Sequence, residues 1–430
     1  MSFLQGYQGY QGYQGYQGYQ GYQGYQGYQG YHGYGGGGAV SLGPGVDPSV
    51  AYALMTTQQD LTGLMQKAVE WTPGSTLAKR LTKLPTIGEA LAAFSWGVDI
   101  RIENAVTELM LPIRMNLRRA GNAWKFVASH SEDRFPILEL VRPEAELFLA
   151  QLPSVQQHVD LRPERLAEIV NQIAIPMQFW ASILDLNPTD HRFTLELFDV
   201  ALAGLSHVNQ YAKHNLACPR PAAYSPSIQP IINPRRFGAF PSGHASEAFL
   251  IARLLQAISD QDVNTDDLNK PPTVDLDLQR LAGRIADNRV VAGVHFPVDS
   301  SAGRLVGESF AGYFLFRCQA EKCTQGWTAR RFCGDKLKGG DGKYVLDFNL
   351  FEPLADKSKK PWPAHFQQLD PGRMGGLPEA YCPTVNKEKS EPFDVDEFER
   401  TSILRALYRR ASAEWTNNSL WRVDSAGAST

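Results

Sequence analysis

Long apolar runs are missing from this sequence of 430 residues, and its mean hydropathy is −0.30. A membrane-spanning helix needs about 20 predominantly apolar residues, so no membrane span is expected. The chain begins Met1-Ser2-Phe3-Leu4-Gln5 and lacks there the basic residues and the apolar core of a secretion signal. These absences together predict a cytoplasmic protein.

Cysteine is scarce and the charges nearly balance. The five cysteines have a spacing that fits no zinc-binding template. Their odd number, without an export signal, indicates reduced thiols rather than a disulfide framework. The net charge of −3 gives no excess of positive charge of the kind that nucleic-acid-binding proteins have. Zinc-finger, disulfide-stapled and nucleic-acid-binding proteins are therefore not expected.

Aliphatic residues and proline are both absent from residues 6–38, which repeat Gly-Tyr-Gln and end in glycines. Such a segment has no apolar core to build, so we expect residues 1–45 to form a disordered, low-complexity tail. The missing proline excludes collagen. Regularly spaced tyrosines can support weak multivalent self-association, and the alternative is a repeat without function.

Residues 46–317 are dominated by helical periodicity, and strand-like alternation is scarce. We expect helices near residues 160–173, 189–213, 243–258, 276–291 and 298–316. Residues 101–130 are less clear and allow a hairpin. The pattern predicts an all-α fold, a helical bundle that forms the catalytic domain. Gly303, Gly307 and Ala311 make a small-residue face that would let another helix approach closely.

Residues 318–430 are rich in Gly, Pro, Lys and aromatic residues, with a final helix expected near residues 395–415. Their own periodicity is poor, so the aromatic side chains need burial elsewhere. We expect an irregular C-terminal extension that wraps the bundle or a partner subunit of a homo-oligomer.

Three short segments contain residues that suit an anion-binding catalytic site. Their patterns are K-x6-R-P, P-S-G-H and R-x5-H-x3-D, and they contain Lys213, Arg220, Ser242, Gly243, His244, Arg289, His295 and Asp299. The three cations match a highly charged anion, and guanidinium groups suit paired oxyanion oxygens. Ser242 and Gly243 would begin a helix, whose amide groups attract anions.

The two histidines in these segments are the groups with an ordinary pKa near neutrality. One can be a ligand or nucleophile while the other moves protons, and Asp299 can orient His295 or cap a helix. Each residue alone has an ordinary structural interpretation as a helix cap, a helix end or a packed histidine. Their joint occurrence in this order favours a single site.

In this order the motifs resemble the signature of the superfamily that unites vanadium-dependent haloperoxidases with type-2 phosphatidic acid phosphatases. The resemblance implies that His295 binds the vanadium of vanadate. It implies that Lys213, Arg220, Ser242, Gly243 and Arg289 bind the vanadate oxygens, with His244 as the acid–base group. Vanadium would then act as a Lewis acid that activates hydrogen peroxide toward halide. One departure is Asn288, where the family usually has serine.

In the phosphatases of the superfamily, the resemblance instead implies that His295 attacks phosphorus and His244 protonates the leaving alcohol. The absence of an expected membrane span favours the soluble, chloroperoxidase-like branch. Phe237 lies seven residues before His244, where the resemblance places a halide-pocket phenylalanine, although simple wall packing explains it equally well.

Three hypotheses follow for the function. The first is a vanadate-dependent haloperoxidase that acts on hydrogen peroxide and a halide. The second is a soluble phosphomonoesterase that acts on a phosphate ester through a phosphohistidine. The third is a self-assembling protein whose tail matters and whose site is inactive. The intact motif residues argue against the third.

Overall fold

The computed structural model describes residue 57 and residues 90–130, 135–233, 237–259, 274–318, 327, 329–335, 337–338, 342–348, 350–351, 366–368 and 402–416. The predicted tail at residues 1–45 lies outside the described residues, as does most of the predicted C-terminal extension. Among the described segments, no helix combines the length and the apolar character that a bilayer crossing requires.

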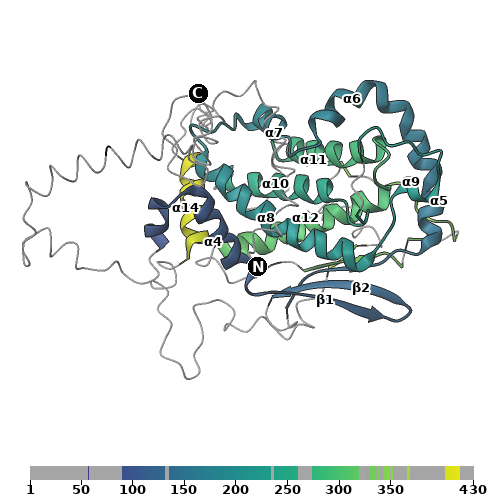
Figure 1. Ribbon diagram of the computed structural model, residues 1–430, viewed down its shortest axis with the longest axis horizontal. Helices are drawn as coiled ribbons and strands as arrows, with labels where there is room; N and C mark the ends of the chain where they lie inside the picture. Colours follow the sequence, from purple (N-terminus) through teal and green to yellow (C-terminus); the bar gives the residue numbers. More distant parts are fainter. Residues whose placement is uncertain are drawn as a thin grey trace, which may run out of the picture.

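Four long helices form the centre of the molecule. Helix α10 (Gly243–Ser259) packs against α8 (Arg192–Leu216), α11 (Val274–Val291) and α12 (Pro297–Cys318) (Figure 1). The predicted helices at residues 189–213, 243–258, 276–291 and 298–316 are therefore confirmed to within a few residues. Almost every side chain of α12 is buried, which places this helix inside the bundle.

Shorter helices surround this centre. They are η2 (Ala90–Ser95), α4 (Val98–Met110), α5 (Ala145–Gln157), η3 (His158–Leu161), α6 (Arg162–Asn171), α7 (Met177–Leu184), α9 (Pro221–Tyr224) and α14 (Ile403–Thr416). Helix α6 packs on α11 and corresponds to the helix expected near residues 160–173. Helix α14 corresponds to the final helix expected near residues 395–415.

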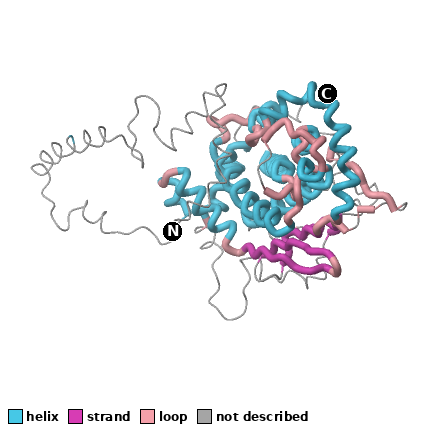
Figure 2. The backbone as a smooth tube through the Cα atoms, turned by 45° about the vertical axis from the view of Figure 1, so that its right-hand side comes forward, coloured by secondary structure: helices cyan, strands magenta, loops and turns pink. Residues whose placement is uncertain are grey.

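A five-stranded sheet lies along one side of the helices, so the all-α prediction is wrong in this respect (Figure 2). The strands are β1 (Ile113–Ala120), β2 (Ala123–His130), β3 (Phe135–Val141), β4 (Arg330–Cys333) and β5 (Phe366–Gln368). They lie in sequence order, and only the β3–β4 pair is parallel. The chain is mostly helical with an added mixed sheet.

The physical reason for this error lies in burial. Strand β3 is central and nearly all of its side chains are buried, so its sequence shows no alternation of apolar and polar residues. Leu117 and Trp124 of the β1–β2 hairpin are more than a third exposed, which blurs the alternation there. Strands β4 and β5 come from the predicted extension. Because β4 pairs with β3, far away in the sequence, no local sequence pattern predicts this pairing. The hairpin that residues 101–130 allowed is confirmed.

The C-terminal helix α14 caps the start of α8. The Glu414 carboxylate accepts hydrogen bonds from the backbone N–H groups of Phe193 and Thr194, at 2.8 and 2.9 Å. The Trp415 indole N–H donates to the Thr194 hydroxyl at 3.0 Å. These N–H groups belong to the first turn of α8 and have no partner within the helix. This part of the extension therefore stabilises the helix whose other end carries Lys213.

The small-residue face of α12 lies against α10, as its spacing predicted. A Cβ at Gly303 would lie 2.8 Å from the Cβ of Ala245, and one at Gly307 would overlap the carbonyl oxygen of Ser246. Real carbon atoms do not approach so closely, so glycine is required at both positions. This close approach brings the start of α10 against the start of α12.

We predict that Gly307→Ala lowers the free energy of unfolding by about 1–3 kcal/mol, because the methyl group must push the two helices apart. Gly312→Ala on the same helix is the matched control, since its Cβ would meet nothing within 4 Å. That control should raise stability by roughly 0.5–1 kcal/mol through helix propensity. Urea denaturation measures both, and equal stability of the two variants would contradict the close packing.

Candidate active site

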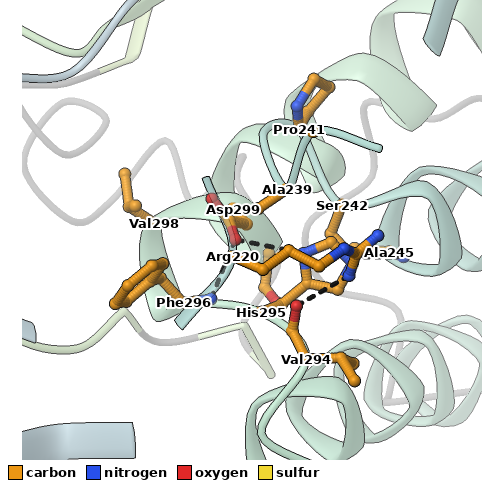
Figure 3. A network of polar contacts seen from close by, with 12 residues as sticks. Arg220, Ala239, Pro241, Ser242, Ala245, Val294, His295, Phe296, Val298 and Asp299 are labelled. Atoms are coloured by element: carbon orange, nitrogen blue, oxygen red, sulfur yellow. Dashed lines mark hydrogen bonds and ion pairs between the residues drawn. The ribbon is translucent and has the colours of Figure 1, made fainter. Parts of the chain in front are cut away.

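The three motifs converge where four helices begin or end. Lys213 lies in the last turn of α8 and Arg289 in the last turn of α11. Ser242 directly precedes α10, and Asp299 lies in the first turn of α12. Figure 3 shows Arg220, Ser242, His295 and Asp299 grouped together. Residues from three separate segments of the sequence therefore share one site.

His295 is oriented by Asp299. The Asp299 Oδ2 atom accepts a hydrogen bond from the Phe296 backbone N–H at 2.9 Å and lies 3.1 Å from His295 Nδ1 (Figure 3). Because Oδ2 accepts from the Phe296 N–H and is therefore an unprotonated oxygen, Nδ1 carries the ring proton and Nε2 presents its lone pair. Nε2 accepts a long hydrogen bond, of 3.4 Å, from Nη1 of Arg220. The imidazole therefore offers an unprotonated nitrogen beside a guanidinium.

Burial determines the charge of this pair. His295 is 3% exposed and Asp299 is fully buried. Burial, followed by the positive charge of Arg220, holds the pKa of His295 well below its ordinary value. Burial also raises the pKa of Asp299 to about 7. His295 is consequently neutral at physiological pH, which is the form that binds a metal or attacks an electrophile.

Arg220 is held by main-chain carbonyl groups and keeps one amino group for a ligand. Its Nε donates to the Phe237 carbonyl at 3.1 Å, and its Nη1 donates to the Val294 carbonyl at 2.8 Å. Its Nη2 makes no hydrogen bond to any described residue. The Phe237 ring lies 5.0 Å from the guanidinium and 5.3 Å from the ammonium of Lys213. Phe237, which is 37% exposed, therefore lines the site beside two cations.

Lys213 uses all three ammonium protons on backbone carbonyls. The acceptors are the oxygens of Gly238, Ala239 and Pro241. Lys213 therefore acts on an anion through its charge and by holding the turn that leads into α10. Burial, with a further contribution from Arg220, lowers its pKa to about 7.

Arg289 is fully buried and is held by neutral acceptors. It donates to the Gln172 carbonyl and the Ile169 carbonyl, each at 3.3 Å, and to the Gln172 side-chain oxygen at 3.1 Å. Its Nε has no hydrogen-bond partner among the described residues. Burial lowers its pKa to about 10, so the group stays charged at neutral pH. A buried guanidinium with an unsatisfied N–H strongly favours an anionic ligand.

The start of α10 adds backbone donors and the second histidine. Ser242 caps the helix, since its Oγ accepts from the Ala245 N–H at 3.4 Å. The N–H groups of Gly243 and His244 belong to the first helical turn, where no intrahelical acceptor exists. His244 Nε2 lies 3.2 Å from the Ile173 carbonyl, so Nε2 carries the proton and Nδ1 is unprotonated. Burial and the charge of Arg289 lower the His244 pKa to about 3.

The donors suit a tetrahedral or trigonal-bipyramidal oxyanion such as phosphate or vanadate. In the described part of the chain, no carboxylate hydrogen-bonds Lys213, Arg220 or Arg289, so their charges are not cancelled by direct ion pairs. The orphaned Nε of Arg289 and the lone pair of His295 Nε2 complete the site. Within the same described part, no cluster of three acidic, His or Cys side chains could hold a bare metal cation. A metal would fit here as its oxyanion.

Residues 197–322 match the sequence model of the PAP2 superfamily. We call these residues the PAP2 segment. It contains all three motifs, from Lys213 to Asp299, and the match confirms the resemblance to this superfamily. It supports an enzyme of the phosphatase or haloperoxidase type. No curated protein matches the chain.

Residues outside the PAP2 segment also contribute to the site. The end of α6 supplies Ile169, Gln172 and Ile173, whose oxygens hold Arg289 and His244. These residues could not be predicted from the sequence motifs, because main-chain acceptors carry no side-chain signal. One signal was available: Gln172 is a polar residue three positions after Ile169 on the buried face of α6.

We predict that the PAP2 segment binds oxyanions more weakly as pH rises through about 7. Lys213 loses its positive charge there, and Asp299 gains a negative charge over the same range. Both changes oppose an anion, so the affinity should fall above pH 7 by up to about tenfold per pH unit for each of the two groups. In the protein without a bound anion, His244, with a pKa of about 3, and Arg289, at about 10, do not titrate between pH 6 and 9.

Isothermal titration with sulfate between pH 6 and 9 measures this effect, because sulfate keeps a constant charge over that range. The slope above pH 7 should become shallower in Lys213→Met. A flat profile in the unmodified protein would show that neither group changes its charge in this range.

Proposed function

We propose that this chain is a vanadate-dependent haloperoxidase that oxidises a halide with hydrogen peroxide. The observation that carries the proposal is the lone pair of His295 Nε2, which is buried and oriented by Asp299. It lies beside three cations, and no carboxylate of the described residues forms a hydrogen bond with any of them. Vanadate, when bound, would supply Lewis-acid activation of peroxide. The PAP2 segment supports this class of chemistry in general terms.

Each residue of the site would have its own role in binding vanadate. His295 would hold vanadium through Nε2, and Asp299 keeps the proton on Nδ1. Arg220, Arg289 and the N–H groups of Gly243 and His244 would bind the oxyanion oxygens, while Lys213 adds charge. These groups bind and orient the ligand in a buried site from which much of the water is excluded.

His244 is the group suited to proton transfer. Its Nε2–H is occupied by the Ile173 carbonyl, so Nδ1 is the atom that would accept a proton from hydrogen peroxide. A bound anion would offset the charge of Arg289 and raise the pKa of His244 from about 3 toward its ordinary range. Phe237 lies beside Lys213 and Arg220, where an apolar wall next to two cations suits a weakly hydrated halide.

The second candidate is a phosphomonoesterase. The Asp299–His295 pair is also the arrangement of an oriented nucleophile, which favours this candidate. His295 Nε2 would attack phosphorus and break the bond to the ester oxygen. The bound phosphate ester would raise the pKa of His244, so that His244 takes up a proton on Nδ1 and then gives it to the departing alcohol. Water would then hydrolyse the phosphohistidine and release inorganic phosphate. The same donors would bind the phosphoryl oxygens.

The deciding experiment is halogenation of an activated diketone by the purified, phosphate-free protein with hydrogen peroxide and bromide or chloride. Orthovanadate is titrated into the reaction, and a sample without vanadate is the control. Activity that appears and saturates with vanadate supports the haloperoxidase. Absence of halogenation, together with hydrolysis of an aryl phosphate that vanadate inhibits, would move the assignment to the phosphatase.

A further inference from the structure

One turn at the end of α6 holds two of the proposed functional side chains. The carbonyl groups of Ile169 and Gln172 accept hydrogen bonds from Arg289, and the next carbonyl, that of Ile173, accepts from His244 Nε2. The last carbonyls of a helix have no intrahelical partner and carry partial negative charge. The end of α6 therefore offers a ready acceptor surface for a cation.

Gln172 is the side chain at the centre of this turn. It is fully buried, and its Oε1 accepts from Arg289 Nη2 at 3.1 Å and from Asn288 Nδ2 at 2.9 Å. Asn288 Nδ2 also donates to Glu168 at 3.0 Å, which ties α11 to α6. Asn288, the residue that departs from the family pattern, thus fixes the amide that contacts Arg289.

The chemical nature of this contact matters for anion binding. An amide oxygen orients a guanidinium through a hydrogen bond but leaves its full positive charge. A carboxylate at the same place would form an ion pair and compete with the anion for Arg289. The Asn288 amide donates a hydrogen bond to the same Gln172 Oε1 atom and thereby keeps this oxygen, rather than the amide nitrogen, directed toward Arg289.

We propose that Gln172 is a positioning residue that orients Arg289 toward the oxyanion through a neutral amide oxygen, so that no carboxylate occupies this contact with Arg289. This inference rests on the proposed oxyanion site and adds a determinant outside the PAP2 segment. Gln172 acts through Arg289, so its loss should weaken anion binding more than it alters the fold.

Orthovanadate binding to the full-length protein at pH 8, measured by calorimetry, tests the proposal. Gln172→Glu is expected to raise Kd by at least about tenfold, since the new carboxylate pairs with Arg289. Asn171→Asp is the matched control, because it adds the same charge one residue earlier at an exposed position of α6. That control should change Kd by less than about twofold.

Two further measurements separate positioning from folding. Gln172→Met keeps the side-chain length without an acceptor and should raise Kd by roughly three- to tenfold with an unchanged circular dichroism spectrum. Wild-type Kd in both Gln172→Glu and Gln172→Met overturns the proposal.

The outcomes also separate this inference from the proposed function. A wild-type protein that binds orthovanadate but fails to oxidise halide would overturn the haloperoxidase assignment, while the Kd values still decide the role of Gln172. A wild-type protein that binds no oxyanion would overturn both.

Discussion

The His295→Ala variant is expected to lose vanadate-dependent halide oxidation by on the order of 10³-fold or more. Its Nε2 is the proposed ligand atom, and the ring is oriented by Asp299 and flanked by Arg220. Alanine leaves the cations in place, so an oxyanion would still be attracted but would lack its covalent anchor. If the chain is instead a phosphomonoesterase, the same variant lacks the nucleophile and loses hydrolysis.

His214→Ala is the matched control for this variant. His214 lies next to Lys213 on α8, and its side chain is exposed rather than part of the site. The control should retain activity within about twofold, as expected for a surface substitution. Halogenation rates at saturating vanadate and peroxide compare the two variants. Retained oxidation in His295→Ala would refute the assignment of His295 as the vanadium ligand.

The grouping of the site residues could be predicted from the sequence because most of them lie in three short motifs. The helix that begins at Gly243 follows a serine whose hydroxyl caps it, and this arrangement is visible as Pro-Ser-Gly-His. The spacing of His295 and Asp299 likewise places both at the start of α12, where the carboxylate reaches the ring. The order of the motifs then indicated that they meet.

Other features depend on contacts between distant segments and left no such pattern. Lys213 is satisfied by three carbonyls of residues 238–241, and the path of a loop is not encoded in periodicity. Gln172 reaches Arg289 from 117 residues away. The sheet is completed by strand β4, which pairs with β3 across an even longer stretch of sequence. Main-chain acceptors and long-range strand pairing both require the assembled fold.

The Asp299→Ala variant is expected to reduce turnover by on the order of 10³-fold while leaving oxyanion binding intact. The Asp299 Oδ2 atom accepts from both the Phe296 N–H and His295 Nδ1. Asparagine would keep both hydrogen bonds by placing its oxygen at that position, so alanine is the informative substitution. Alanine removes the shared acceptor, and nothing then holds the ring proton on Nδ1 or fixes the direction of Nε2. The lone pair that would bind vanadium or attack phosphorus is no longer oriented toward the anion.

A difference between binding and turnover distinguishes this loss of ring orientation from disruption of the site. Removing the Asp299 charge makes the site more positive, so sulfate should bind to Asp299→Ala as tightly as to the wild type or more tightly. Nitrogen-15 NMR of the histidine rings should show that the ring proton of His295 no longer resides on Nδ1 alone. Asp277→Ala, at an exposed position of α11, is the matched control and should change neither quantity. Parallel loss of sulfate binding and turnover would instead indicate that Asp299 holds the fold of the site, because a change in the His295 ring alone leaves the cations where they are.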